Sequence, residues 1–142
     1  MQKLTDAPLK GIKKAIIRAD LDVPFDSQGA VLEPYRLEAL LPTLQYLLEK
    51  NIRPVICGHI GRPEGKEDPT LSTSKLRSYF DSKIGENSYT LLENLRFNPG
   101  EETPSEEFAS ELASHADIYI NESFATSHRK AASLTLLPAK LP

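Results

Sequence analysis

Two cationic side chains follow a short apolar run in the stretch G-H-I-G-R-P at residues 58–63. His59 and Arg62 stand beside glycines, which let the backbone approach another group closely. Arginine offers a planar fork of donors that fits the oxygens of a phosphate or a carboxylate. The stretch therefore indicates a site for a small anion, provided that the rest of the chain brings further cations to the same place.

Short apolar runs and leucine-rich segments alternate along the chain. The runs are solidly apolar or β-branched, as in strands buried on both faces of a parallel sheet. We expect strands at 15–17, 54–57, 89–92 and 118–120. Apolar residues at three- and four-residue spacing predict helices over 34–50, 73–81 and 104–115. The alternation predicts an α/β fold, with a parallel sheet and helices on both faces.

Local signals set the expected ends of these helices. Pro42 falls inside the first helical pattern and should kink or break it. Ser72 is expected to cap the second helix, with Leu76 and Phe80 facing inward. The third helix is expected to start with a capping box from Thr103 to Glu106, with Pro104 as its first residue.

Polar residues follow each expected strand. In a parallel sheet these positions share one edge, and ligands of open α/β sheets bind outside the carboxyl ends of the strands. Asp20 and Asp22 follow the first strand, and cations follow on other segments. The candidate cations are Arg36, His59, Arg62, Arg96 and Arg129.

Each of these residues also has an ordinary structural interpretation. Arg36 alone, at the start of a helix, reads best as a surface charge, and a loop histidine is usually solvated or satisfied locally. Asp20 and Asp22 are also suited to a turn ahead of Pro24. Glu93 is a possible partner for Arg96. The residues alone leave both interpretations open.

Composition narrows the classes of function. The chain has 142 residues, 39% hydrophobic and 26% charged, with a net charge of −3 and no run of lysines or arginines. One domain of this kind fits neither a nucleic-acid binder nor a membrane protein. The opening M-Q-K-L-T-D lacks the apolar region of a secretory signal. Cys57 has no partner for an internal disulfide, and we expect it in the core of a cytoplasmic protein.

The chain lacks the common phosphate loops and metal motifs. It contains no G-x-x-x-x-G-K-[ST] and no G-x-G-x-x-G, so nucleotide binding by this chain alone is not expected. Its single cysteine and three scattered histidines do not form a metal-binding pattern. We therefore expect no metal and no cofactor in this chain.

Five stretches in a fixed order together resemble the N-terminal domain of the phosphoglycerate kinase family. They are R-A-D-L-D-V-P at 18–24, G-H-I-G-R-P at 58–63, L-L-E-N-L-R-F at 91–97, I-Y-I-N-E-S-F at 118–124 and S-H-R-K-A-A-S at 127–133. The resemblance implies a Rossmann-like three-layer domain that binds 3-phosphoglycerate or 1,3-bisphosphoglycerate. In that family a second, C-terminal domain binds Mg-ADP or Mg-ATP and closes over the first.

The resemblance also implies roles for single residues. Asp20 and Asp22 would contact the glycerate, and Arg36 would stabilise the transferring phosphoryl group. The basic patch would consist of Arg36, His59, Arg62, Arg96 and Arg129. Residues 1–142 would be one phosphoglycerate-binding domain, a monomer that is inactive unless a nucleotide-binding domain joins it in cis or in trans.

Three features depart from the family pattern. Asp22 stands where the family has asparagine, which puts a negative charge near an anionic ligand. The segment between Arg62 and Leu91 is shorter, as if about one strand and one helix were absent. The nucleotide domain is not in this sequence. A module that holds a small polyanion without turnover, or a degenerate domain kept for protein contacts, therefore stays an alternative.

Overall fold

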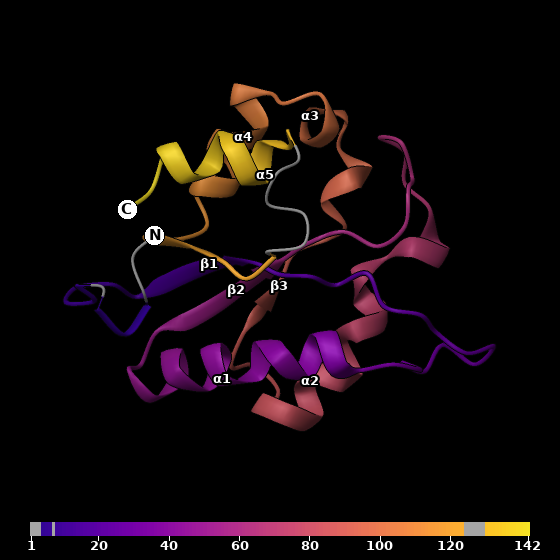
Figure 1. Cartoon of the computed structure of the whole chain (residues 1–142), viewed down its shortest axis with the longest axis horizontal. Helices are drawn as coiled ribbons and strands as arrows, with labels where there is room; N and C mark the ends of the chain where they lie inside the picture. Colours follow the sequence, from indigo (N-terminus) through magenta and orange to yellow (C-terminus); the bar gives the residue numbers. More distant parts are fainter. Residues whose placement is uncertain (1–3, 7, 124–129) are drawn as a thin grey trace.

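One parallel sheet forms the centre of the protein (Figure 1). The computed structural model describes residues 4–6, 8–123 and 130–142. The strands are β1 (Lys14–Arg18), β2 (Arg53–Cys57), β3 (Thr90–Leu91) and β4 (Ile118–Asn121), in the order β3-β2-β1-β4. All three strand pairings are parallel. The four strands lie where the apolar runs predicted them, and the expected α/β fold is confirmed.

The register of the sheet aligns the ends of the strands. Arg18, the last residue of β1, lies beside Cys57 of β2 on one side and beside Asn121 of β4 on the other. The segments that follow β1 and β2 leave the sheet on the same side, at the right of Figure 1. The polar residues after each strand therefore start from one edge of the sheet, as the sequence predicted.

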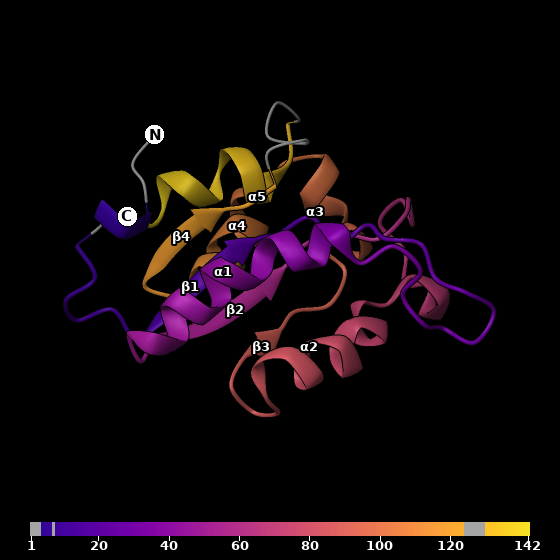
Figure 2. The ribbon, with the colours of Figure 1, turned by 60° about the horizontal axis from the view of Figure 1, so that its bottom comes forward.

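Helices cover both faces of the sheet (Figures 1 and 2). The helices α1 (Tyr35–Glu49) and α2 (Arg77–Ile84) lie on one face. The opposite face carries α3 (Pro99–Glu102), α4 (Glu106–Ala113) and α5 (Ala132–Thr135). Short 3₁₀ turns occupy Leu4–Asp6, Pro69–Leu71, Thr73–Leu76, Leu95–Phe97 and Leu137–Ala139.

The core is divided between the two faces. Ile17 of β1 packs with Leu44 of α1 and Phe80 of α2, whereas Ile16 packs with Phe108 of α4. Alternate residues of one strand thus enter different clusters, which explains why the strands are apolar throughout. Cys57 is fully buried, as expected, and burial raises the pKa of its thiol to about 12.

Two expected helix features differ in the structure. Pro42 does not break α1, which runs from Tyr35 to Glu49, because its buried leucines hold it against the sheet despite the missing N–H group. The capping box at Thr103 does not form. Ser105 caps α4 instead, with its Oγ accepting from the N–H of Phe108 at 3.2 Å. Thr103 follows α3, a short helix that the sequence did not predict.

The segment between Arg62 and Leu91 contains two 3₁₀ turns and one helix, α2. Ser72 caps the 3₁₀ turn at Thr73–Leu76, which leads directly into α2, and Leu76 and Phe80 are buried as predicted. This stretch contains no strand before Thr90, so β3 is an edge strand of two residues. Across the described residues, no helix has the length and apolarity needed to cross a membrane.

We predict that Leu44→Ala strongly destabilises the fold. Leu44 is fully buried between α1 and the sheet, and truncating such a side chain costs roughly 2–5 kcal/mol. The same change at Leu32, which is 56% exposed, is expected to cost less than about 0.5 kcal/mol. Urea unfolding followed by circular dichroism measures both variants. Similar losses of stability in the two would contradict this account of the core.

Candidate functional site

Asp22 and the G-H-I-G-R-P loop meet at the carboxyl edge of the sheet. Asp22 Oδ1 accepts a hydrogen bond from the N–H of Gly61 at 3.1 Å, and its Oδ2 lies 3.9 Å from His59 Nε2. Gly61 adopts a φ of 63°, a left-handed conformation that favours glycine. The loop after β2 is therefore held beside the segment after β1, as the strand-end rule predicted.

Gly58 allows a close approach to the chain's own backbone after β1 rather than to a ligand. A Cβ at this position would lie 2.7 Å from the carbonyl oxygen of Ala19 and 2.8 Å from Leu21 Cγ. The close approach is thus to the chain's own backbone after β1. This contact brings the two loops together and so positions His59 next to Asp22.

Arg36 joins the same edge from the first turn of α1. Its Nη1 donates to the backbone oxygen of Asp22 at 2.9 Å and forms an ion pair with Asp20 Oδ1 at 3.4 Å. The Arg36 side chain remains 43% exposed. Both aspartates therefore contact Arg36, and Asp22 also faces His59.

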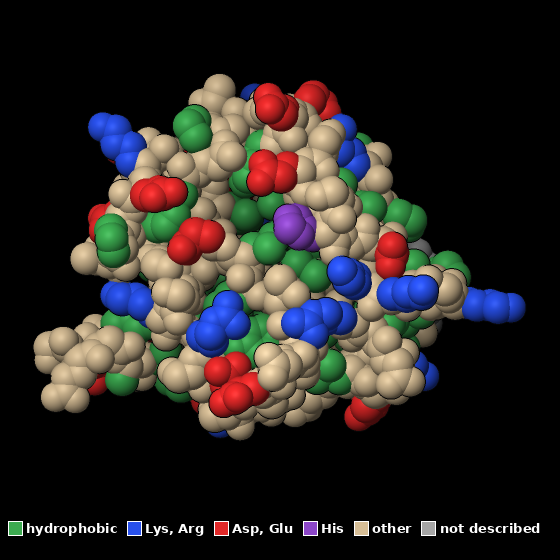
Figure 3. Space-filling view, turned by 180° about the vertical axis from the view of Figure 1, so that it is seen from behind, with side chains coloured by type: hydrophobic (Ala, Val, Ile, Leu, Met, Phe, Trp, Pro, Cys, Tyr) green, Lys and Arg blue, Asp and Glu red, His purple; other side chains and the backbone are tan. Residues whose placement is uncertain are grey.

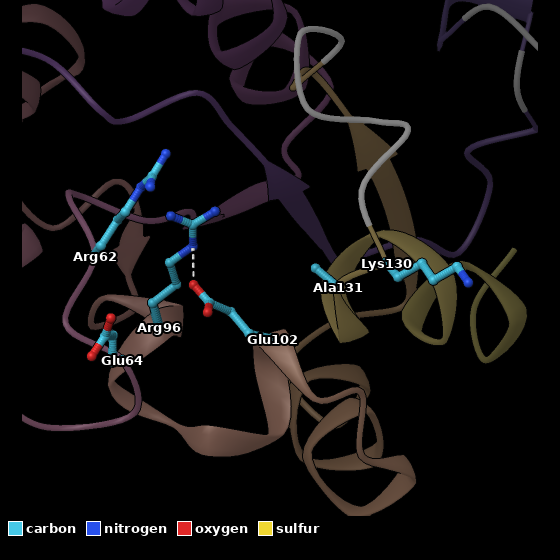
Figure 4. A pocket seen from close by; sticks show the side chains of 6 residues that line it. All are labelled: Arg62, Glu64, Arg96, Glu102, Lys130 and Ala131. Atoms are coloured by element: carbon cyan, nitrogen blue, oxygen red, sulfur yellow. Dashed lines mark ion pairs between the residues drawn. The ribbon is translucent and has the colours of Figure 1, made fainter.

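Arg62 and Arg96 line an open pocket of about 360 Å³ on this edge (Figure 4). Arg96 is largely buried. Its Nη1 donates to the oxygen of Gly61 at 3.1 Å, and its Nε pairs with Glu102 Oε1 at 3.0 Å. Arg62 is exposed, and no ion pair joins it to another residue that the structure describes. The other residues of the pocket wall are Glu64, Lys130 and Ala131.

Glu93 does not pair with Arg96. Its carboxylate accepts hydrogen bonds from Ser72 Oγ, from the N–H and hydroxyl of Thr73 and from the N–H of Asn94. Burial acts against the charged form, but these donors hold the pKa of Glu93 below its usual value. Glu93 thus anchors the loop after β3 to the start of the 3₁₀ turn at Thr73–Leu76.

Asn94 fixes the loop that carries His59. Its Nδ2 donates to the backbone oxygens of Ile60 and Leu71, at 2.8 and 2.9 Å. Its Oδ1 accepts from the N–H of Arg96 at 3.0 Å. A single buried amide therefore ties the loop after β2 to the segment that presents Arg96.

Behind the edge lies a buried polar cluster that the sequence did not single out. Arg18, only 2% exposed, donates from Nη2 to His59 Nδ1 at 3.0 Å and from Nε to Ser133 Oγ at 2.9 Å. Glu101, 1% exposed, accepts from the N–H and the hydroxyl of Ser133. The one signal in the sequence was an arginine at the end of an otherwise apolar strand.

Most of the predicted site residues thus come together. Contacts link Arg36, Asp20, Asp22, His59 and Arg96 through Gly61, and Arg62 follows Gly61 directly. Arg129 lies outside the described residues. On the back of the molecule, acidic and basic side chains are both spread over the surface (Figure 3).

A cluster of this composition suits a small molecule with more than one anionic group. Arginine forks from several segments can each bind two oxygens, and a glycine N–H adds a neutral donor. The described residues include no group of three or more histidine, cysteine or acidic side chains that could hold a metal ion. The N–H and guanidinium donors of this arrangement fit binding of an anion and stabilisation of its charge.

Comparison with known proteins gives one consistent family. The family model for phosphoglycerate kinase matches residues 4–89 and 81–142. The phosphoglycerate kinase of Picosynechococcus sp. is 35% identical over 152 residues, covering 92% of this chain, and that of Aquifex aeolicus is 36% identical, covering 95%. The two matches to the family model overlap at residues 81–89, inside the segment that we expected to be shorter than in the family.

Solved structures agree with the sequence relatives. The structure of phosphoglycerate kinase from Coxiella burnetii superimposes with a TM-score of 0.82 at 33% identity, over 91% of this chain and 38% of that one. This chain likewise spans 38% and 39% of the lengths of the Picosynechococcus and Aquifex relatives. On these matches, which cover nearly the whole sequence, the chain belongs to the phosphoglycerate kinase family.

Proposed function

We propose that this chain is the phosphoglycerate-binding half of a phosphoglycerate kinase. The observation that carries the proposal is the run of contacts from Arg36 through Asp22 and His59 to Gly61 and Arg96. It gathers four segments of the chain at the edge where α/β proteins bind ligands. The reaction would be phosphoryl transfer between 1,3-bisphosphoglycerate with ADP and 3-phosphoglycerate with ATP.

The proposed ligand carries anionic groups of the kind that these side chains bind. Phosphoglycerate carries a phosphate and a carboxylate, so it needs donors at two separated points. Arg62 and Arg96 line one open pocket, while Arg36 is not part of its wall and donates to the backbone oxygen of Asp22. We assign Asp20, Asp22, Arg36, His59, Arg62 and Arg96 to the substrate site, together with Arg129.

Arg36 is the residue that we assign to the transferring phosphoryl group. Its side chain is 43% exposed and is held by Asp20 and by the backbone oxygen of Asp22, so its position is fixed while its outer face meets solvent. Phosphoryl transfer depends mainly on positioning and on stabilising the charge of the transferring group. A guanidinium at this place supplies such charge without taking part in bond formation.

The residues that the structure describes show no site that fits a magnesium nucleotide. The sequence has no Walker-type phosphate loop, and the described residues offer no metal-binding group of side chains. In the family, Mg-ADP or Mg-ATP accepts or supplies the phosphoryl group. A nucleotide-binding domain, in cis or in trans, would therefore have to complete the enzyme.

Asp22 favours a second function, a module that holds a small polyanion without turnover. Its carboxylate accepts from Gly61 and faces His59, which are two donors that an anionic ligand would use. Binding would then be weak and would depend on displacing Asp22 from these donors. The two functions differ in their requirement for a nucleotide domain and share the binding site.

We expect 3-phosphoglycerate to bind the chain weakly, with an affinity that falls as salt is added, because its charges would be screened. Arg62→Ala should weaken binding about 10-fold, since it removes an exposed guanidinium from the pocket. Lys50→Ala is the matched control. Lys50 is the C-cap of α1, shortly before β2 begins, and so lies at the opposite edge of the sheet. Isothermal titration calorimetry that gives equal effects for the two variants would rule out this edge as the site.

Asp22→Asn should strengthen the binding of 3-phosphoglycerate. The amide oxygen can still accept from the N–H of Gly61, while a negative charge beside the ligand disappears. Removing one like charge near a partly solvated site is worth about 1 kcal/mol, or about 5-fold in affinity. Paired titrations at one pH and ionic strength measure this. If the variant binds as wild type does, or more weakly, the Asp22 carboxylate does not oppose the ligand.

The chain alone is expected to have no kinase activity, because its sequence has no Walker-type loop and its described residues offer no metal-binding group for the magnesium nucleotide. A coupled assay with ATP, magnesium and 3-phosphoglycerate tests this expectation. Activity that co-purifies with the chain through successive columns, and that Arg36→Ala removes, would show that the chain binds the nucleotide itself.

A further inference from the structure

A buried ion pair lies directly behind His59. Arg18 at the end of β1 is 2% exposed, Glu101 in α3 is 1% exposed, and Arg18 Nε lies 4.0 Å from Glu101 Oε2. Burying two charges costs several kcal/mol each unless they are paired and hydrogen-bonded. A buried pair of this kind is therefore weak evidence for stability.

Ser133 joins the two charges. Its hydroxyl accepts from Arg18 Nε at 2.9 Å and donates to Glu101 Oε2 at 2.5 Å. Its backbone N–H donates to Glu101 Oε1 at 2.9 Å. Ser133 thus binds both oxygens of the Glu101 carboxylate. Because its hydroxyl oxygen accepts from Arg18, the hydroxyl proton points at Glu101. This arrangement fixes the plane of the Arg18 guanidinium.

The Arg18 guanidinium also forms a hydrogen bond with His59. Arg18 Nη2 lies 3.0 Å from His59 Nδ1, and an arginine can only donate, so Nδ1 must accept. The hydrogen of a neutral His59 ring is then assigned to Nε2, the nitrogen on the side of Asp22 and the ligand edge. Arg18 Nη1 is bound to the oxygen of Ala19 at 2.6 Å, which further limits its movement.

We propose that Glu101 is a positioning residue, which acts through Ser133 and Arg18 to hold His59 with its Nε2–H directed at the anion site. The ligand at that site rests on the proposed function, whereas the orientation of the ring does not. Glu101 is not among the residues that line the pocket and is almost fully buried. Its charge keeps the Arg18 guanidinium inside the protein, where that group can donate to His59.

Two-bond ¹H–¹⁵N spectra of the histidine rings test the proposal on the full chain without any ligand. The signals of His59 are those that disappear in His59→Gln. In wild type at neutral pH, we expect separate shifts for an accepting Nδ1 and a protonated Nε2. In Glu101→Gln, which keeps the volume and removes the charge, the two shifts should move toward each other as both tautomers become populated.

Two further variants complete the test. Glu107→Gln makes the same chemical change on an exposed part of α4 and should leave the His59 spectrum as in wild type. Ser133→Ala removes the joining hydroxyl and keeps both charges, so it should also mix the tautomers, and it replaces Glu101→Gln if that variant does not fold. Circular dichroism confirms folding. A wild-type ring protonated at Nδ1, or unchanged tautomers in both buried variants, would overturn the proposal.

Binding of 3-phosphoglycerate separates this proposal from the proposed function. We expect Glu101→Gln to bind about 5-fold more weakly than wild type and Glu107→Gln to bind equally well. If wild type does not bind 3-phosphoglycerate while its His59 tautomer depends on Glu101, the proposed function fails and the positioning role stands. If Glu101→Gln binds normally with mixed tautomers, the ring orientation does not serve the anion site and the proposal is wrong.

Discussion

Parallel pairing of β1 with a strand on each side is the constraint on which the rest of the structure depends. Because β1 lies between β2 and β4 and is covered on both faces, everything polar that follows it must find a partner near the carboxyl edge. The aligned ends at Arg18, Cys57 and Asn121 bring separate loops within reach of one another. The candidate site is a direct result of this register.

Carboxylates pair with the arginines at this edge, and they differ in how exposed they are. The pairs are Arg18 with Glu101, Arg36 with Asp20, and Arg96 with Glu102. Glu101 is buried behind the site, whereas the side chains of Asp22 and Glu102 are 44% and 49% exposed. Exposed polar contacts of this kind contribute only about 0–1 kcal/mol, so a multiply charged ligand can compete with Asp22 for the His59 ring and with Glu102 for Arg96. The buried pair has no such competitor. We interpret the exposed acids as keeping the cations in place until a ligand arrives.

The sequence predicted the strands and the main helices because both carry strong periodic signals. Solidly apolar runs mark strands covered on two faces, and the leucine spacing of α1 outweighs the local effect of Pro42. The capping box at Thr103 failed because competing caps lie on either side of it. Asn98 caps α3 and Ser105 caps α4, and the T-x-x-E pattern alone does not rank these alternatives.

The site was predictable as far as its residues follow strands. Asp20, Asp22, His59 and Arg96 stand at strand ends, and the rule for parallel sheets brings them together. The cluster of Arg18, Glu101 and Ser133 was not predictable in this way. Its contacts join residues 32 and 115 positions apart, on segments whose packing no local pattern describes. Glu101 in particular reads as one more surface acid in the stretch N-P-G-E-E-T.

The central claim is that phosphoglycerate binds at the carboxyl edge of the sheet, and backbone amide shifts measure this most directly. ¹H–¹⁵N correlation spectra of the chain would be recorded during titration with 3-phosphoglycerate, with sodium sulfate at matched ionic strength as the reference. The account predicts the largest shifts at Asp22, Arg36, Gly61, Arg62 and Arg96, beyond those that sulfate causes. Shifts centred elsewhere, such as the hollow formed by Leu95, Phe108, Leu112 and His115, or no shifts beyond those of sulfate, would contradict it.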